Sequence, residues 1–265
     1  MASGQAVEVV QLTDTHLFGV TGRRMKGADT HRTLIDVVDL VIAQGKPDLV
    51  LLTGDVSQDE TPQSYSHVHS VIKKIGVPVY YLPGNHDLPR VMYGQYTDEC
   101  VPFKADRNAF AGDWIFILLD TTIEGQIDGR LSEPELERLD RDLTTHADKH
   151  AMVCMHHNPF SVGPGAFNEF GCLNGDEFFS VIDKHRNVKA ILTGHVHQEH
   201  DSERNGVRLL SSPSTCIQFL PGAATFTLDL KPPGYRRFTL NPDGKVETSV
   251  HRLANIPEGM ELSNT

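Results

Sequence analysis

The sequence lacks three features that would each indicate a particular class of protein. No stretch approaches the ~20 apolar residues of a membrane-spanning helix. The polar start, residues 1–5, is followed almost at once by an apolar strand pattern, which leaves no room for a secretory signal. The four cysteines show no C-x-x-C spacing, so we expect free thiols in a cytoplasmic protein and neither a zinc finger nor a disulfide framework.

Clusters of positive charge are also missing. No Lys/Arg cluster is longer than two residues, and the formal charge is −11, from 35 acidic and 24 basic residues. A nucleic-acid binder needs a basic patch, and a lipid-surface protein needs a basic amphipathic helix. We therefore expect neither nucleic acid nor a membrane as a partner.

The 265 residues, of which 39% are hydrophobic, are enough to bury a substantial core. No internal repeat or low-complexity linker divides the chain, so we expect a single domain over residues 1–265. Short apolar or β-branched runs alternate with helical patterns over the first three quarters of the sequence. Turn signals at Asn205-Gly206 and Pro242-Asp-Gly244 predict antiparallel hairpins in the last quarter. The predicted fold class is α/β, with two packed sheets and helices outside them.

Several boundaries follow from local signals. We expect helices over 30–44 and from Thr61-Pro62 to Gly76, and a third that starts at the capping box Ser132-Glu-Pro-Glu135 and ends near His146. A shorter helix is expected near 175–185, and no regular structure is expected over 88–110. The segment from Asn158 to Asn174 is rich in glycine and reads as the longest loop, which is often a functional feature.

What the sequence does contain is histidine and carboxylate at strand ends. Fourteen histidines are spread along the chain. Five polar segments each follow an apolar strand pattern: Asp14-Thr-His16, Gly54-Asp55, Gly84-Asn-His-Asp87, His156-His157 and Gly194-His195-Val-His197. In open α/β sheets the site is built at the carboxyl ends of the strands, so these segments are expected to meet.

The donors in these segments are carboxylates, imidazoles and one amide, without a thiolate, which suits iron, manganese or zinc better than calcium. Seven of these donors are too many for one ion and about right for two ions that share a ligand: Asp14, His16, Asp55, Asn85, His156, His195 and His197. If the backbone stays extended, the side chains of Asp14 and His16 lean to one side, as do those of His195 and His197. A pair two residues apart spans roughly 6–7 Å. That span can straddle two metals ~3.5–4 Å apart, with Asp55 between them.

These motifs, in this order, resemble the calcineurin-like metallophosphoesterase superfamily. The longer segments Gly54-Asp-Val-Ser-Gln-Asp59, Leu82-Pro-Gly-Asn-His-Asp87, Gly194-His-Val-His-Gln-Glu199 and Pro213-Ser-Thr-Cys-Ile-Gln-Phe219 are similar to those of the bacterial class III 3′,5′-cyclic-AMP phosphodiesterases. The resemblance implies a four-layer α-β-β-α sandwich with two mixed sheets. It also implies a pair of metal ions, usually iron or manganese and sometimes zinc, in divalent or mixed-valence form.

The resemblance also implies a role for each site residue. Asp14, His16 and His197 would hold the first metal, Asn85, His156 and His195 the second, and Asp55 would bridge them. The catalytic residues would be Asn85, which holds the phosphodiester, and His86, which protonates the departing 3′-oxygen. Contacts with the substrate would come from His16, Asp55, Asn85, His86 and His197.

Three neighbouring residues keep open roles. Asp87 either orients an imidazole or closes its turn, at equal weight. His157 is expected to support the site or pack beneath it, and Asp59 to brace the loop after Asp55. For Asp120, which ends an apolar run, a structural turn is expected.

The expected reaction is hydrolysis of 3′,5′-cyclic AMP to 5′-AMP, with this cyclic nucleotide as the small-molecule partner. A broader phosphodiesterase or phosphomonoesterase, acting on 2′,3′-cyclic nucleotides or other small phosphoesters, is the alternative, because one fold hosts many chemistries. A non-catalytic protein-binding scaffold is a remote one, since such a module is expected to have lost ligands. The oligomeric state stays open, with a homodimer among the possibilities.

Two stretches are candidates for the walls that read the nucleotide. One is the 158–174 loop, with Phe160, Phe167 and Phe170 available to stack on a base. The other is Ser211 to Phe219, where hydroxyls and Gln218 could bond to sugar or purine. The competing interpretation is that the phenylalanines are core residues and the second stretch is a simple turn.

Overall fold

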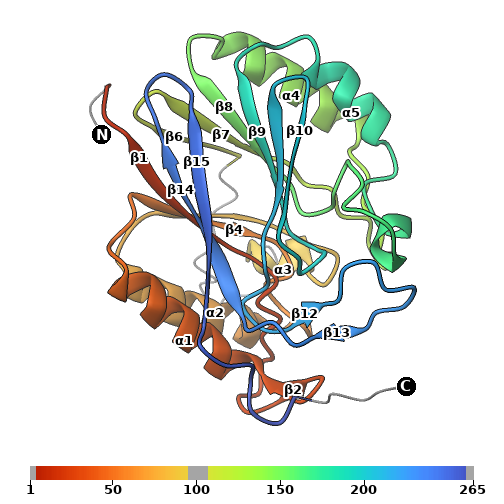
Figure 1. Ribbon diagram of the computed structural model, residues 1–265. Coiled ribbons are helices and arrows are strands. Elements are labelled where there is room, and N and C mark those ends of the chain that lie inside the picture. The colour runs from red at the N-terminus through yellow and green to blue at the C-terminus, as the bar shows by residue number, and fades with distance from the viewer. Residues whose placement is uncertain (1–3, 95–106, 261–265) are drawn as a thin grey trace.

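Two β-sheets pack face to face, and helices cover the outer face of each (Figure 1). The computed structural model describes residues 4–94 and 107–260. The arrangement is the four-layer α-β-β-α sandwich that the sequence predicts.

The first sheet has five strands in the order β15-β14-β1-β4-β5. The strands β1, β4 and β5 run parallel, whereas β14 is antiparallel to both β1 and β15. Their bounds are β1 Val7–Leu12, β4 Leu49–Thr53, β5 Val79–Leu82, β14 Gly234–Leu240 and β15 Val246–Arg252.

The second sheet has six strands in the order β10-β11-β9-β8-β7-β6. Its four middle strands are parallel, and each edge strand is antiparallel to its neighbour. Their bounds are β6 Asn108–Ala111, β7 Trp114–Leu118, β8 His150–Cys154, β9 Val188–Thr193, β10 His200–Arg204 and β11 Val207–Ser211. The predicted hairpins at Asn205-Gly206 and around Gly244 are confirmed, joining β10 to β11 and β14 to β15.

Two helices begin at the predicted starts, where the side chains of Thr61 and Ser132 each accept a hydrogen bond from the backbone N–H three residues on. The side chain of Asp29, for which no cap was predicted, does the same at the start of the first helix. The first-sheet helices are α1 Thr30–Ala43 and α2 Pro62–Ile72, which runs on into the 3-10 turn η1 Lys73–Ile75. The second-sheet helices are α4 Glu133–Thr145 and α5 Gly175–Ile182.

The short elements lie in the connections. Over 88–110 the expectation of irregular chain is wrong at both ends, where α3 Pro89–Met92 and the edge strand β6 form; residues 95–106 lie outside the described part. Pro89 stands at the first position of α3, where its fixed φ favours a helical turn. The other short elements are β2 Arg24–Met25, β3 Ala28–Asp29, η2 Ala166–Glu169, β12 Gln218–Phe219 and β13 Leu228–Asp229.

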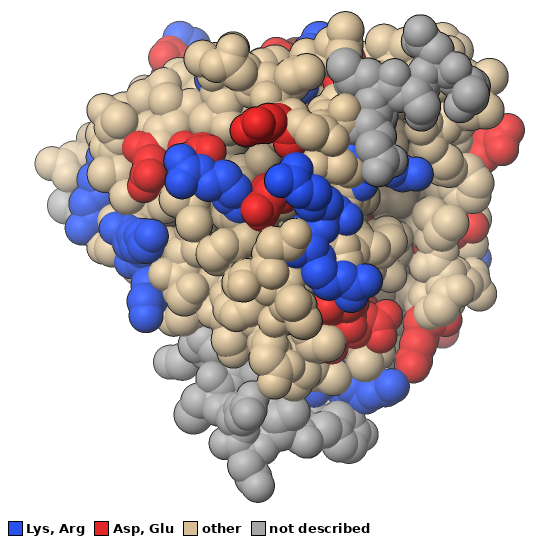
Figure 2. Space-filling view, turned by 90° about the horizontal axis from the view of Figure 1, so that it is seen from below, with Lys and Arg blue, Asp and Glu red and all other residues tan. Residues whose placement is uncertain are grey.

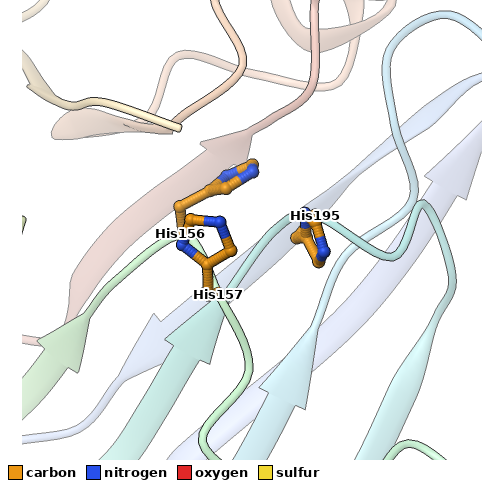
Figure 3. Close-up of side chains that lie close together, drawn as sticks. All are labelled: His156, His157 and His195. Carbon is orange, nitrogen blue, oxygen red and sulfur yellow. The ribbon is translucent and has the colours of Figure 1, made fainter. Parts of the chain in front are cut away.

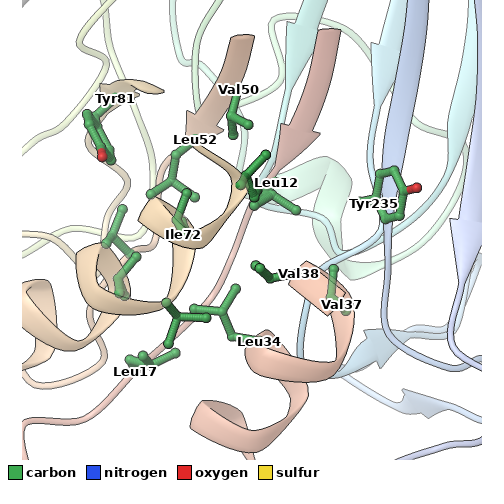
Figure 4. Packing of buried hydrophobic residues seen from close by; sticks show 14 of the residues in the cluster. Leu12, Leu17, Leu34, Val37, Val38, Val50, Leu52, Ile72, Tyr81 and Tyr235 are labelled. Atoms are coloured by element: carbon green, nitrogen blue, oxygen red, sulfur yellow. The ribbon is translucent and has the colours of Figure 1, made fainter. Parts of the chain in front are cut away.

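Alternation along the strands divides the apolar side chains between layers. In β1 and β4, Val10, Leu12, Val50 and Leu52 face the helices α1 and α2. Figure 4 shows Leu12, Val50 and Leu52 with Leu34, Val37 and Val38 of α1 and Ile72 of α2. This contact explains why α1 is apolar at the helical spacing seen in the sequence.

The other side chains of the same strands form the layer between the sheets. Leu49 and Leu51 point inward to meet Trp114 and Phe116 of β7, and all four are buried. A third cluster, on the outer face of the second sheet, packs against α4 and α5. The inner layer fixes the position of one sheet relative to the other. It therefore also holds together the strand ends that carry the polar motifs.

Among the described residues, no helix is both long and apolar enough to span a bilayer. On the face seen from below, Lys and Arg side chains lie among Asp and Glu side chains (Figure 2). This mixture gives that face no extended surface of one sign.

Phe116→Ala should lower the free energy of unfolding by about 3–5 kcal/mol, because it leaves a cavity between the sheets. Phe110→Ala on the edge strand β6 is the control: its ring is 51% exposed, and we expect a change within about 1 kcal/mol. Urea unfolding of both variants tests this. Equal losses would show that the inner layer does not carry the stability assigned to it.

Candidate functional site

The five polar segments meet where the carboxyl ends of the two sets of parallel strands converge. The loop after β1 bonds to the loop after β4, with Asp14 N–H donating to the Gly54 carbonyl (3.0 Å) and His16 N–H to that of Asp55 (2.9 Å). In the second sheet the Gly194 N–H donates to the carbonyl of His156 (3.1 Å). Across the sheets, the His195 N–H donates to the carboxylate of Asp14 (3.1 Å). The side chains are thus placed by a continuous backbone network.

The backbone is left-handed at five of the seven ligand positions, so the extended backbone assumed for the D-x-H and H-x-H pairs is not found. Asp14, His16, Asp55, His195 and His197 all have positive φ, between 48° and 69°. This conformation costs roughly 1–2 kcal/mol per residue for a side chain with a Cβ. The D-x-H and H-x-H pairs still converge, but they do so because each ligand ends its strand in a sharp turn. Clustering of such strain at one place is typical of functional sites.

Two glycines of the motifs are required by space. A Cβ on Gly84 would lie 2.2 Å from Asp55 Oδ1, and one on Gly54, whose φ is +91°, would lie 2.4 Å from His156 Nδ1. Both contacts are shorter than any side chain allows. The glycines of G-D and G-N-H-D therefore let the turns after β4 and β5 close against the site.

Asp14, His16 and His197 form the first group of donors. All three are buried, and their ligand atoms lie within 4.8 Å of one another. The Nε2 atoms of His16 and His197 are 3.1 Å apart, and His197 Nε2 is 3.5 Å from Asp14 Oδ1. These three residues are the set predicted for the first metal.

Asn85, His156 and His195 form the second group. The Asn85 Oδ1 atom lies 3.2 Å from His156 Nε2 and 3.0 Å from His195 Nδ1. Figure 3 shows His156 and His157 at the end of β8, with His195 facing them from the loop after β9. The predicted second set is therefore also assembled.

Asp55 lies between the two groups. Its Oδ2 is 3.6 Å from His16 Nε2, and its Oδ1 is 3.3 Å from His156 Nε2. One oxygen thus faces each group, as the prediction of a bridging carboxylate requires. The side chain is nearly inaccessible, so a shared charge at this point is shielded from water.

The outward-facing ring nitrogens test whether the donor set fits metal ions. His16 Nδ1 is 2.8 Å from Gln58 Oε1, His156 Nδ1 is 2.9 Å from the Thr53 carbonyl, and His197 Nδ1 is 2.9 Å from the Ile217 carbonyl. Each carbonyl oxygen accepts a hydrogen bond from the Nδ1–H group, so that in the neutral ring the opposite Nε2 directs its lone pair into the site. Metal-ligating histidines almost always have such a partner, so the residues present fit a pair of cations.

The field within the site favours the binding forms of His16, His195 and Asp55, but it protonates His156 when no cation is present. Burial lowers the pKa of His156, and the charge of Asp55 outweighs burial and raises that pKa to about 9. Burial lowers the pKa of His16 to about 3 and that of His195 to about 4, so both rings are neutral at physiological pH. Burial alone would raise the pKa of Asp55, but the charge of His156 outweighs it and holds that pKa well below its ordinary value. Neutral imidazole and ionised carboxylate are the forms that bind a metal.

Asp87 closes its turn and does not orient an imidazole. Its carboxylate accepts hydrogen bonds from the N–H groups of Gly84 (2.9 Å), Val56 (3.0 Å) and Ser57 (2.9 Å). Burial raises the pKa of Asp87 to about 7. The described partner of His86 is Gln58 instead, whose Nε2 lies 3.3 Å from His86 Nδ1. Gln58 has no predicted role, although it stands within the motif that follows Asp55.

The remaining open residues have structural contacts. Both ring nitrogens of His157 are hydrogen-bonded beneath the site: Nδ1 lies 2.7 Å from Thr121 Oγ1, and Nε2 lies 3.0 Å from the Ile127 carbonyl. Asp59 accepts from the Gly19 N–H (3.0 Å), so it braces the loop after His16 against the loop after Asp55. Asp120 closes a turn by accepting from the N–H of Thr122 (2.9 Å).

A pocket of about 400 Å³ opens over the donors. Six predicted site residues line it: His16, Asp55, Asn85, His86, His195 and His197. Its other walls are Met25, Lys26, Gly125, Gln126, Ile127, Phe167, Phe219 and Phe226. A depression of this size, with one polar floor and apolar walls, is suited to a small molecule.

The predicted nucleotide walls are partly right. Phe167 and Phe219 line the pocket, whereas Phe160 and Phe170 do not. Gln218 is buried, and its amide donates to the Ser214 carbonyl (2.9 Å), so it supports the turn.

Phe226 was missed because it lies outside both stretches. Its ring centroid is 5.0 Å from that of Phe167 and 5.9 Å from that of Phe219. Phe226 is 45% exposed, and an isolated phenylalanine in a loop gives no signal in the sequence.

Comparison with known proteins agrees with this geometry. Residues 7–199 match the family described as calcineurin-like phosphoesterase. A curated relative from Escherichia coli K12, named 3′,5′-cyclic adenosine monophosphate phosphodiesterase CpdA, is 37% identical over 96% of this chain and 93% of its own length. A protein of the same name from Pseudomonas aeruginosa is 36% identical, with the same coverage of both chains. A 3′,5′-cyclic-nucleotide phosphodiesterase from a Nostoc species is 35% identical over 93% of this chain and 92% of its own length.

Solved structures share the fold at low identity. A dimetal phosphatase from Danio rerio superposes with a TM-score of 0.62 at 14% identity, covering 93% of this chain and 98% of its own. A purple acid phosphatase from yellow lupin gives a TM-score of 0.61 at 15% identity, covering 94% of this chain and 55% of its own. The family match spans most of the chain, and the curated relatives exceed 30% identity over nearly all of it. This protein belongs to the calcineurin-like phosphoesterase family.

Proposed function

We propose that this protein is a two-metal phosphodiesterase that hydrolyses 3′,5′-cyclic AMP to 5′-AMP. The observation that carries the proposal is the position of Asp55, with one oxygen toward each group of nitrogen and oxygen donors. The names of the curated relatives support the same substrate.

Asp14, His16 and His197 would hold one cation and Asn85, His156 and His195 the other, with Asp55 shared. When bound, such a pair supplies a hydroxide nucleophile at neutral pH and neutralises charge on the phosphoryl oxygens. Iron or manganese is our choice of metal, and zinc suits the same donors.

The chain's own residues would position the diester. Asn85 lies on the pocket floor between His156 and His195, where its amide can contact a phosphate oxygen. Lys26, at the tip of the β2–β3 hairpin, is the one Lys or Arg side chain that lines the pocket in the described part of the chain. It places a positive charge beside an anionic ligand in a protein of formal charge −11.

His86 would supply the proton for the leaving group. Attack on phosphorus breaks its bond to the 3′-oxygen, and the departing oxygen needs a proton because an alkoxide is a poor leaving group. His86 lines the pocket next to Asn85 and is in no predicted ligand set. General-acid help of this kind is typically worth ~10²–10⁴-fold in rate.

The base would lie against an aromatic wall made of Phe167, Phe219 and Phe226. Phe219 contacts the ring of His197, with centroids 4.9 Å apart, so the wall begins at the donors and extends outward. Ile127, 48% exposed, also lines the pocket. A flat purine can stack on such a surface.

The single domain, the cytoplasmic location and a homodimer remain predictions. Gel filtration tests the last of these.

Asp55→Ala should release metal from both positions and abolish hydrolysis of cyclic AMP, because it removes the shared ligand. Metal analysis of the purified variant and a product assay measure the two losses. Asp183→Ala, at a carboxylate paired with Arg204 and outside the pocket, is the control and should keep both metals. Two bound metals and near-normal turnover in Asp55→Ala would refute the assignment of Asp55.

His86→Ala should keep both metals and lower kcat for cyclic AMP by about 10²–10⁴-fold. The loss should be much smaller for bis-p-nitrophenyl phosphate, because p-nitrophenolate leaves with little help from a proton. His146→Ala, after the end of α4, is the control and should match the wild type. A loss of equal size for both substrates would argue against proton donation.

Phe226→Ala should raise KM for cyclic AMP several-fold and leave the hydrolysis of a small alkyl p-nitrophenyl phosphodiester almost unchanged, because the wall contacts the base and not the phosphate. Phe160→Ala is the matched control: this ring stacks on His200 and lies outside the pocket. If Phe226→Ala impairs hydrolysis of both substrates equally, the wall supports the metal-binding donors and does not contact the base.

A further inference from the structure

Gln58 connects two histidines to which the proposed function gives different tasks. Its Oε1 lies 2.8 Å from Nδ1 of His16, a predicted metal ligand, and its Nε2 lies 3.3 Å from Nδ1 of His86, the predicted acid. The two rings are close, with centroids 5.0 Å apart and planes 76° from parallel. One amide therefore contacts both the predicted metal ligand His16 and the predicted acid His86.

The position of Gln58 is fixed by the motif loops. Its backbone N–H donates to the Leu17 carbonyl (2.8 Å), in the loop after β1. The preceding residue, Ser57, donates its N–H to the carboxylate of Asp87 in the turn after β5 (2.9 Å). The side chain is only partly exposed. The amide is thus held between the loops that carry His16 and His86.

An amide is chemically asymmetric, and this asymmetry decides which nitrogen of each ring carries the proton. The oxygen only accepts, so His16 must carry its proton on Nδ1, which leaves Nε2 free to ligate. The NH₂ group only donates, so His86 must accept at Nδ1, which places the proton of the neutral ring on Nε2. Turning the amide over would reverse both assignments together.

The alternative orienting group for His86 is already engaged. Asp87, the adjacent carboxylate, accepts three backbone N–H groups of its own turn and of the loop after β4. The His86 backbone N–H donates to Asp55 Oδ1 (2.9 Å), which fixes the main chain but not the tautomer.

We propose that Gln58 is a positioning residue that sets the tautomers of His16 and His86 together, committing one ring to metal ligation and the other to proton donation. The assignment of the two tasks rests on the proposed function, whereas the linked tautomers do not.

The tautomers can be read in the metal-free protein, without any assay of activity. Long-range ¹H–¹⁵N NMR of histidine-labelled protein at a pH of about 8, above the ordinary pKa of histidine, distinguishes protonated from unprotonated ring nitrogens. Loss of signals in His16→Gln and His86→Gln assigns the two rings. The wild type should show His16 protonated at Nδ1 and His86 at Nε2.

Gln58→Glu distinguishes the contact of Gln58 with His16 from its contact with His86. A carboxylate still accepts from His16 Nδ1, so that ring should not change, but it cannot donate, so His86 should acquire a proton on Nδ1. Gln63→Met, an exposed glutamine on α2, is the control and should leave both rings unchanged. An unprotonated His86 Nδ1 in Gln58→Glu, or a protonated one in the wild type, would overturn the proposal.

Gln58→Met tests the consequence in the metal-loaded enzyme. It should lower kcat for cyclic AMP by about 10–100-fold, with a smaller loss for bis-p-nitrophenyl phosphate and KM little changed. Normal kcat for cyclic AMP would overturn the positioning role. If wild-type protein fails to hydrolyse cyclic AMP at all, the substrate proposal is wrong, and the NMR comparison still decides whether the tautomers are linked.

Discussion

The interaction on which the structure depends is the contact of the buried carboxylates of Asp14 and Asp55 with the surrounding imidazoles. Removing charged groups from water costs several kcal/mol per ion unless partners compensate. Here the compensation comes from both sheets: the Asp14 carboxylate accepts the His195 N–H, and the Asp55 carboxylate accepts the His86 N–H and faces His156, whose pKa is raised to about 9. The two sheets must therefore keep their relative position for the charges to remain paired. The inner apolar layer with Trp114 and Phe116 holds that position.

The same arrangement explains how strained turns are retained. Left-handed backbone at five ligand positions is unfavourable in isolation. It is offset by hydrogen bonds between the loops, by Asp87 binding the turn after β5 to the loop after β4, and by glycines at 54 and 84 that allow close approach. The result is a rigid polar floor whose charge and ring orientations are set before a ligand arrives, which is how electrostatic catalysis avoids reorganisation during the reaction.

The layers and the meeting of the polar segments could be predicted from the sequence, because both follow from local rules. Apolar strands that end in polar turns indicate a site at a sheet edge, and Thr61 and Ser132 begin their helices as patterns of short range predict. The prediction of extended backbone at the ligand pairs failed, because the conformation there depends on contacts between residues distant in the sequence. The left-handed turns at Asp14 and His195 are imposed by the neighbouring loops.

The walls of the pocket were predicted less well than its floor. Phe226 lies in a loop that a backbone hydrogen bond, from the Ala166 N–H to the Ala223 carbonyl, ties to the 158–174 segment. Gln58 acquires its role only from the meeting of His16 and His86. Neither contact has a periodicity or spacing that reading along the chain could detect.

Hydrolysis of cyclic AMP should require two cations that share Asp55 as a ligand. The decisive measurement adds manganese to metal-free protein in measured steps and follows the nucleotide product by chromatography. We expect the activity to reach its maximum only as the second equivalent binds, with 5′-AMP as the product. Full activity at one equivalent, turnover without metal, or 3′-AMP as the product would contradict it.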